Sequence, residues 1–207
     1  VYEYSHESSD YNKEELLFNG KQCMPRMINN ICSFEPRFHF ITSLIRDIHK
    51  EGRKLLILSD RREYLTNTMD WINTNICPSG LYVGGMKPYE LRESQEKDII
   101  LGTFSMASEG MDIPKLNTCI LASPKSDVEQ SVGRIFREKA CDRTHHPLIV
   151  DIIDDFSMFT KQASKRQILY RKMNFKLFMD GEEVTKKKRQ SKKKQADIFE
   201  IDECLID

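Results

Sequence analysis

Two arginines at a short, fixed interval are the residues of this chain best suited to chemistry. They lie in the octapeptide Gln130-Ser131-Val132-Gly133-Arg134-Ile135-Phe136-Arg137. On a helix, residues three apart leave the same face, so the guanidinium groups of Arg134 and Arg137 would lie side by side. A guanidinium is always charged and binds paired oxygens through a fork of N–H donors. The pair therefore predicts a site for a multiply charged anion, such as the terminal phosphates of a nucleotide.

The same octapeptide also fits a purely structural interpretation. Val132, Ile135 and Phe136 would then form the buried stripe of an amphipathic helix, with both arginines on its solvated face. Short matches of this kind recur by chance. The neighbouring segments must therefore decide between the two interpretations.

A second polar segment, from Gly102 to Pro114, directly follows an apolar run. Thr103 and Ser105 would stand at the carboxyl end of a strand, where open α/β sheets bind ligands and where hydroxyls suit phosphate oxygens. Asp112 would be presented from a loop, where it could accept hydrogen bonds from a ribose or orient an arginine. The structural alternative is an ordinary turn with Asp112 as a cap.

The elements that must position these residues alternate between apolar runs and amphipathic segments over residues 53–153. This alternation predicts an α/β fold, an open parallel sheet with helices on both faces. Strands are expected at 54–59, 81–83, 98–103, 117–123 and 147–153. Helices are expected at 40–48, at 65–72, from Pro88, from a cap at Ser126 or Asp127, and at 156–173 with Phe159, Ile168 and Leu169 inward.

In this order the motifs resemble motifs V and VI of superfamily 2 helicases. The matching residues are Thr103, then Glu109-Gly110-Met111-Asp112-Ile113-Pro114, a strand, and Gln130-x-x-Gly133-Arg134-x-x-Arg137. The segment from Leu56 to Arg61 resembles motif IV more loosely. Tyr82 to Lys87 resembles the glycine loop of phage and large-DNA-virus helicases akin to repair and transcript-release enzymes. The resemblance spans residues 36–180 and implies the C-terminal RecA-like lobe.

The resemblance implies a role for each matching residue. Arg134 and Arg137 would act as arginine fingers on the γ-phosphate of ATP, and Gln130 would position nucleotide and water. The other nucleotide-side residues are Glu109, Gly110, Asp112 and Gly133. The nucleic-acid backbone would be held by Ser59, Arg61, Gly84, Gly85, Lys87, Thr103 and Ser105. Backbone contacts carry little sequence information, as a translocase requires.

The chain departs from a complete helicase in two motifs. Neither a G-x-x-x-x-G-K-[ST] loop nor a DExD/H box occurs in it, so the groups that hold the ATP phosphates and Mg²⁺ would belong to an N-terminal lobe of the same protein. The chain opens on Val1, and we expect a fragment of a longer protein that is inactive alone. Ser131 replaces the arginine of many RNA helicases, which favours a DNA or mixed-duplex translocase.

The implied function is the C-terminal motor lobe of an ATP-dependent nucleic-acid helicase or translocase. An alternative of a different class is a catalytically inert scaffold or interaction module that keeps the motor fold. A freestanding nucleotide-binding protein would need its own phosphate loop, and the Gly84-Gly85 pair is too short to serve. The upstream coding sequence distinguishes the first two, because only the motor requires a Walker loop there.

Charge and cysteine content restrict the remaining classes. Lys and Arg together number 32, as do Asp and Glu, so the chain exerts no global attraction on nucleic acid or membrane. No apolar run approaches the roughly 20 residues of a membrane span. Six cysteines without a CxxC pair predict reduced thiols, no metal site and a cytoplasmic or nuclear location, or a viral factory or virion for a viral protein.

Three regions are expected along the chain. Residues 1–35 would connect from the upstream lobe, with a strand at 1–4, and residues 36–180 would form the helicase-like domain. Residues 181–207 contain a basic block at 185–194 followed by an acidic one. This composition predicts a solvated, mobile tail on a monomeric fragment.

Overall fold

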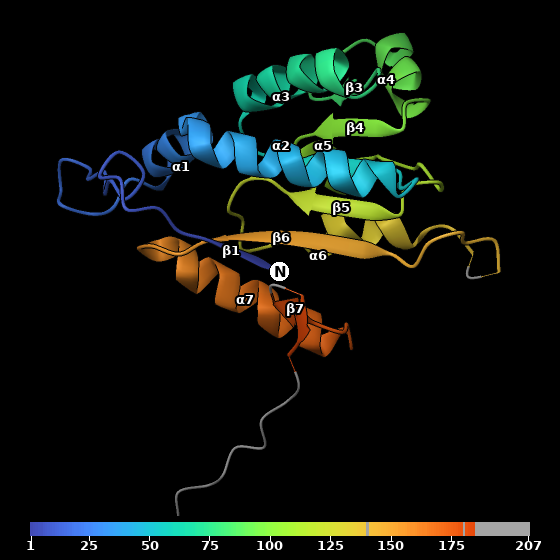
Figure 1. Cartoon of the computed structure of the whole chain (residues 1–207). Coiled ribbons are helices and arrows are strands. Elements are labelled where there is room, and N and C mark those ends of the chain that lie inside the picture. The colour runs from blue at the N-terminus through green and yellow to red at the C-terminus, as the bar shows by residue number, and fades with distance from the viewer. Residues whose placement is uncertain (140, 180, 185–207) are drawn as a thin grey trace, which may run out of the picture.

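A computed structural model describes residues 1–139, 141–179 and 181–184 (Figure 1). Its main sheet has six strands in the order β1-β6-β5-β2-β4-β3, and every pairing in it is parallel. The strands are β1 Tyr2–Tyr4, β2 Leu55–Leu58, β3 Gly80–Tyr82, β4 Ile99–Gly102, β5 Thr118–Leu121 and β6 Leu148–Asp154. The open parallel sheet with helices on both faces is confirmed.

Strand β2 shows why the apolar runs are continuous rather than alternating. It pairs with β4 on one side and β5 on the other, and each of its four residues is fully buried. Leu55 and Ile57 face one apolar cluster, whereas Leu56 and Leu58 face the other. Because helices cover both faces of the sheet, both sets of side chains on β2 are buried, and this strand is apolar throughout.

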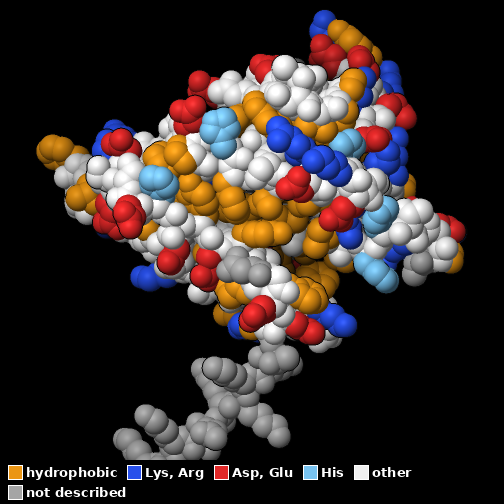
Figure 2. Space-filling view, viewed as in Figure 1, with side chains coloured by type: hydrophobic (Ala, Val, Ile, Leu, Met, Phe, Trp, Pro, Cys, Tyr) orange, Lys and Arg blue, Asp and Glu red, His pale blue; other side chains and the backbone are white. Residues whose placement is uncertain are grey.

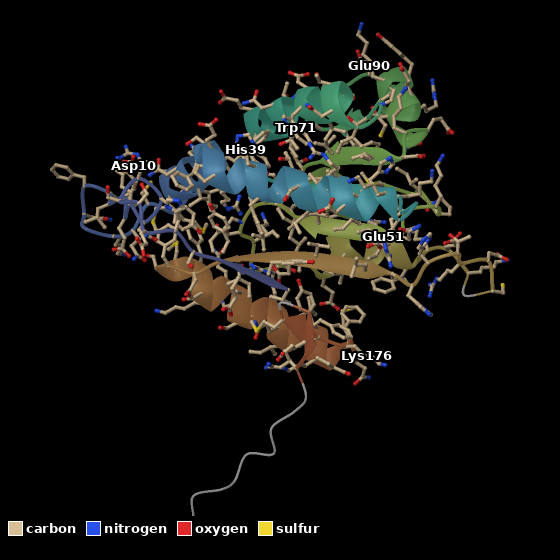
Figure 3. All side chains as sticks on the ribbon, viewed as in Figure 1. Asp10, His39, Glu51, Trp71, Glu90 and Lys176 are labelled. Carbon is tan, nitrogen blue, oxygen red and sulfur yellow. The ribbon has the colours of Figure 1, made fainter. Side chains whose placement is uncertain are left out.

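A different set of helices covers each face of the sheet. The first covers the face of Leu55 and Ile57 and contains α1 Met24–Ser33, α2 Glu35–Lys50 and α3 Arg62–Asn75. Arg46 of α2 lies 5.0 Å from the ring centre of Trp71 of α3, which is labelled in Figure 3. The second covers the face of Leu56 and Leu58. It contains α5 Phe104–Glu109, α6 Glu129–Val132 and the 3-10 helix η1 Gly133–Phe136.

Two further helices complete the domain. α4 Pro88–Gln95 lies against the edge strand β3, and α7 Met158–Lys172 follows β6. Phe159 of α7 belongs to the first apolar cluster, and Tyr170 belongs to the second. α7 therefore joins the two layers beyond β6 (Figure 1).

Residues 1–35 are part of the folded domain. The expected strand at the start of the chain is present as β1, which pairs with β6. The structure adds α1, and it places Tyr11 fully buried against the rings of Phe34 and Phe156. The buried residues Met27, Ile28, Ile31 and Cys32 of α1 do have helical spacing, but the stripe spans fewer than two turns and was not predicted.

Three details of the predicted helices are wrong. Residues 104–109 form α5, where no helix was expected, and α6 is capped at Val128 rather than at Ser126 or Asp127. Ile168 is 64% exposed. The buried stripe of α7 is instead Phe159, Ala163, Arg166 and Tyr170. An apolar pattern misses this stripe, because one of its members is a charged residue that finds its partner only in the fold.

The predicted tail is only partly described. Glu182–Glu183 form β8, which pairs antiparallel with β7 Phe178–Met179. Residues 185–207, with both the basic and the acidic block, lie outside the described residues. Among the helices of the described ranges, none combines the length and the apolar character that crossing a membrane demands.

Candidate functional site

The residues predicted to contact nucleic acid meet at one edge of the sheet. Strands β2, β4 and β3 are neighbours and run parallel, so their carboxyl ends lie along the same edge. The segments that follow these three strands carry Ser59, Arg61, Thr103, Ser105, Gly84, Gly85 and Lys87. We call this row the carboxyl edge.

The side chains on the carboxyl edge differ in access to solvent. Lys87 and Ser105 are exposed, as are Gly84 and Gly85, and Gly85 has a φ of +85°, which favours glycine. The backbone N–H of Lys87 donates to Glu90 Oε2 (2.7 Å; Glu90 is labelled in Figure 3). The loop after β3 is thus closed by the first turn of α4 and presents open backbone to solvent.

Two of the predicted hydroxyls serve the local structure. Ser59 is fully buried, and its Oγ accepts a hydrogen bond from the backbone N–H of Arg61 (3.1 Å). Thr103 Oγ1 accepts from the backbone N–H of Met106 (3.4 Å) and so caps α5. In this conformation the Ser59 side chain cannot meet a phosphate, because it faces the interior.

Arg61 fixes the turn after β2 to the N-terminal helix. Its Nη2 donates to the carbonyl of Pro25 (3.2 Å), and its Nη1 lies 3.5 Å from the carbonyl of Asp60. Beneath this turn, burial raises the pKa of the Cys32 thiol to about 11. This thiol is therefore neutral at physiological pH and unsuited to nucleophilic chemistry.

The arginine octapeptide is not one continuous α-helix. α6 ends at Val132, and the chain continues as the 3-10 helix η1, with Arg134 inside it and Arg137 as its C-cap. A 3-10 helix has about three residues per turn, so side chains three apart still share a face. Arg134 indeed contacts the last turn of α5, and Arg137 contacts Asp112 in the segment that follows α5. The shared face follows from 3-10 rather than α-helical geometry.

Arg134 is held on the last turn of α5. Its Nε donates to the carbonyl of Ala107 (2.6 Å), and its Nη2 donates to the carbonyl of Ser108. Carbonyls in a last helical turn lack partners within the helix, and a cation there also meets the negative end of the helix dipole. Arg134 is half-buried and satisfies these carbonyls.

Arg137 is held more lightly. Its Nη1 donates to Asp112 Oδ1 (2.9 Å), and the two side chains are 41% and 67% exposed, respectively. The structure therefore places Asp112 in contact with an arginine, and its role towards a ribose stays a prediction. Gly110 lies between the two contact points, and Gln130 and Glu109 are exposed nearby on α6 and α5. The structure thus brings the two helicase-like motifs into direct contact.

The buried contact between α5 and α6 depends on a residue whose role sequence reasoning missed. Ser131 is 1% exposed, and its Oγ lies 2.9 Å from Ser108 Oγ and 3.3 Å from the carbonyl of Phe104. A small hydroxyl side chain fits this place between two helices. Ser131 therefore faces the interior, and the preference for DNA or a mixed duplex stays a prediction.

Lys125 is a second residue that sequence reasoning missed. Its Nζ donates to Asp60 Oδ2 (2.8 Å), while the backbone N–H of Asp60 donates to Ser123 Oγ (3.2 Å). These contacts join the turn after β2 to the connection between β5 and α6. The only signal in the sequence is a lysine shortly after a strand, which is too common to single out.

The chain has relatives of known name among the proteins of large DNA viruses. No protein-family model matches the chain. The chain is 37% identical over 179 residues to a protein of Acanthamoeba polyphaga mimivirus named "Putative ATP-dependent RNA helicase L396", covering 82% of this chain and 34% of that protein. It is 29% identical over 99 residues to "Putative ATP-dependent RNA helicase QP509L" of African swine fever virus (strain Badajoz 1971 Vero-adapted), covering 47% and 19%.

A solved structure has a similar fold. T4 UvsW superposes with a TM-score of 0.62 at 20% identity, covering 77% of this chain and 37% of that one. The fold is therefore the α/β fold of a helicase RecA-like domain. The chain is homologous to proteins of large DNA viruses named ATP-dependent RNA helicases, and the expected resemblance to viral helicases is confirmed. The chain spans 34% of the length of the mimivirus relative.

Proposed function

We propose that the chain is the C-terminal motor lobe of an ATP-dependent nucleic-acid helicase or translocase. The observation that carries this proposal is the exposed Arg137, oriented by Asp112 beside Arg134 in the contact between the two helicase-like motifs. The names of the viral relatives support ATP as the nucleotide. On this proposal ATP and Mg²⁺ are held by an upstream lobe of the same protein, because the chain has no phosphate loop.

The two arginines would contribute differently to ATP cleavage. To reach a phosphate, Arg137 would break its ion pair with the exposed carboxylate of Asp112, and breaking such a pair costs about 1 kcal/mol or less. Arg134 would have to leave two carbonyls of α5. We therefore assign Arg137 as the group that meets the γ-phosphate and stabilises the charge of the transition state. On this proposal Arg134 holds η1 in place, and the exposed Gln130 would contact the nucleotide.

The carboxyl edge would bind the nucleic-acid backbone. Lys87, Ser105 and the open backbone of Gly84 and Gly85 supply hydrogen-bond donors for phosphates, and none of them reads a base. On the face seen in Figure 2, positive and negative side chains are interspersed, and the net charge is zero. We expect binding by this lobe alone to be weak and to fall as salt rises.

The test compares three substitutions of the same type in the complete protein. Arg137→Ala and Arg134→Ala should abolish nucleic-acid-stimulated ATP turnover while nucleotide binding survives. The matched control is Arg171→Ala, which removes an exposed arginine of α7 outside the site. Turnover that is unchanged in both site variants would refute the motor and favour an inert scaffold with the motor fold.

A further inference from the structure

Strand β6 carries two buried aspartates that face opposite sides of the sheet. Asp151 is fully buried, and Asp154 is 1% exposed. Because side chains alternate along a strand, residues three apart point to opposite faces. Asp154 accordingly meets a residue from α2, and Asp151 meets residues from α7.

The first aspartate pairs with Arg37 of α2. Arg37 is fully buried, and its Nε and Nη2 donate to Asp154 Oδ1 (2.6 Å) and Oδ2 (2.9 Å). The hydroxyl of Tyr11 donates to Asp154 Oδ1 (2.7 Å). Burial disfavours a charged guanidinium, but the negative charge of Asp154 outweighs it, and the pKa of Arg37 is raised. Arg37 is therefore charged in the folded protein.

The second aspartate repeats this arrangement on the other face. Arg166 is 2% exposed, and its Nε donates to both oxygens of Asp151 (3.1 and 2.9 Å) while its Nη2 donates to Oδ1 (2.8 Å). The hydroxyl of Tyr170 donates to Asp151 Oδ2 (3.0 Å). Each aspartate is thus held by one arginine and one tyrosine.

The remaining nitrogen of each guanidinium reaches the same short segment. Arg37 Nη1 donates to the carbonyl of Ala122 (3.0 Å), and Arg166 Nη1 donates to the carbonyl of Lys125 (2.6 Å). Residues 122–128, which we call the approach segment, lead from β5 into α6 and thence to Arg134 and Arg137. Two rigid planar groups therefore bridge β6 to the approach segment from opposite faces of the sheet.

Two buried ion pairs contribute little net free energy to the stability of a fold. Replacing such a pair with apolar residues of similar volume is often neutral or stabilising, because desolvation offsets the attraction. What an apolar pair cannot supply is a directed bond to a particular carbonyl. The guanidinium fork supplies it, since its donors have a fixed geometry.

We propose that Arg37 and Arg166 are positioning residues that set the place of Arg137 by fixing the approach segment. This inference rests on the proposed function, in which Arg137 meets the γ-phosphate. Neither arginine touches the nucleotide, so substitution should lower kcat and leave the KM for ATP unchanged. A misplacement of about 1 Å can cost on the order of a hundredfold in rate, and we expect a loss of roughly tenfold to a hundredfold.

The experiment uses Arg37→Lys and Arg166→Lys in the complete protein. Lysine keeps the charge next to each aspartate, but it lacks the fork that also reaches the carbonyl. We expect amide hydrogen exchange to accelerate in residues 126–132 more than in β2, and kcat to fall at constant KM. Acceleration that is equal in β2 and in residues 126–132 would show a purely structural role and overturn the proposal.

Two less disruptive variants provide a second test if the lysine variants do not fold. Tyr11→Phe and Tyr170→Phe leave both ion pairs and remove only a hydroxyl. Tyr82→Phe is the matched control, since it removes a buried hydroxyl that pairs with Gln95 on α4. Both variants should loosen residues 126–132 more than this control does. If neither does, the proposal is wrong.

The two proposals fail in different ways. If Arg137→Ala abolishes turnover and the lysine variants neither accelerate exchange in residues 126–132 nor slow turnover, the positioning role is refuted and the motor proposal stands. If exchange in residues 126–132 accelerates and Arg137→Ala leaves turnover unchanged, Arg37 and Arg166 do fix this region but the arginine-finger assignment is wrong. Both outcomes are read from the same protein preparations.

Discussion

The chain contains an aspartate–arginine ion pair in a buried and in an exposed environment. The same substitution in each pair tests how far burial determines its contribution to stability. Asp151→Asn and Asp112→Asn both replace a carboxylate oxygen beside an arginine with an amide nitrogen. Asp151 and Arg166 are buried, whereas Asp112 and Arg137 are 67% and 41% exposed in their side chains. The two substitutions should therefore differ greatly in their effect on stability.

The expected magnitudes follow from the contacts. Asp151 accepts from two nitrogens of Arg166 and from the hydroxyl of Tyr170. An asparagine there has one acceptor oxygen, and its amide donors face other donors. Arg166 is then left as an unpaired buried charge, which costs about 3–5 kcal/mol of unfolding free energy. Asp112→Asn breaks a single exposed contact and should cost no more than about 1 kcal/mol.

Urea unfolding measures both values. With a slope of about 2 kcal/mol per molar urea, Asp151→Asn should lower the midpoint by roughly 1.5–2.5 M. Asp112→Asn should lower it by at most about 0.5 M on the same slope. Equal shifts, or a larger shift for Asp112→Asn, would refute the reasoning, because burial would then not determine the strength of these pairs.

Two further predictions concern ionisation and reactivity. Burial, and then the charges of Asp154 and Asp151, raise the pKa of Tyr11 and Tyr170 above the ordinary 10.0. As pH rises, these tyrosines therefore ionise in the unfolded chain before they ionise in the folded one. The free energy of unfolding should fall above pH 10 by up to about 1.4 kcal/mol per tyrosine per pH unit. Urea midpoints between pH 9 and 11 measure this slope, Tyr170→Phe should reduce it, and a flat profile would contradict it. Among the cysteines of the described residues, Cys141 is exposed, whereas burial raises the pKa of Cys119; an aromatic disulfide reagent should modify Cys141 quickly and Cys119 only on unfolding. Rapid modification of Cys119 in the folded chain would contradict its burial.

Local pattern predicted most of the sheet and the neighbourhood of the site. Each apolar run became a buried strand, because continuous Leu, Ile and Val suit only a parallel sheet covered on both faces. Parallel order then brings the ends of β2, β4 and β3 to one edge. The contact of Arg137 with Asp112, 25 residues earlier in the chain, follows the same logic. Its two residues belong to motifs that the helicase resemblance places together.

The features that pattern could not predict depend on partners distant in sequence. Arg37 and Arg166 look like surface charges until Asp154 and Asp151 are brought to them, 117 and 15 residues away. Ser59 follows a strand like any exposed ligand-binding hydroxyl, but its turn folds it inward. Short helices such as α5 have too few residues for a period to be visible.

The central claim is that Arg137 stabilises the transition state of ATP cleavage. The most direct measurement is the rate of a single turnover of bound ATP by the complete protein with nucleic acid present, comparing Arg137→Ala with Arg171→Ala. We predict a fall on the order of a thousandfold or more for Arg137→Ala, as for other arginine fingers, with ATP affinity unchanged and the Arg171→Ala rate normal. A normal cleavage rate in Arg137→Ala would contradict the claim.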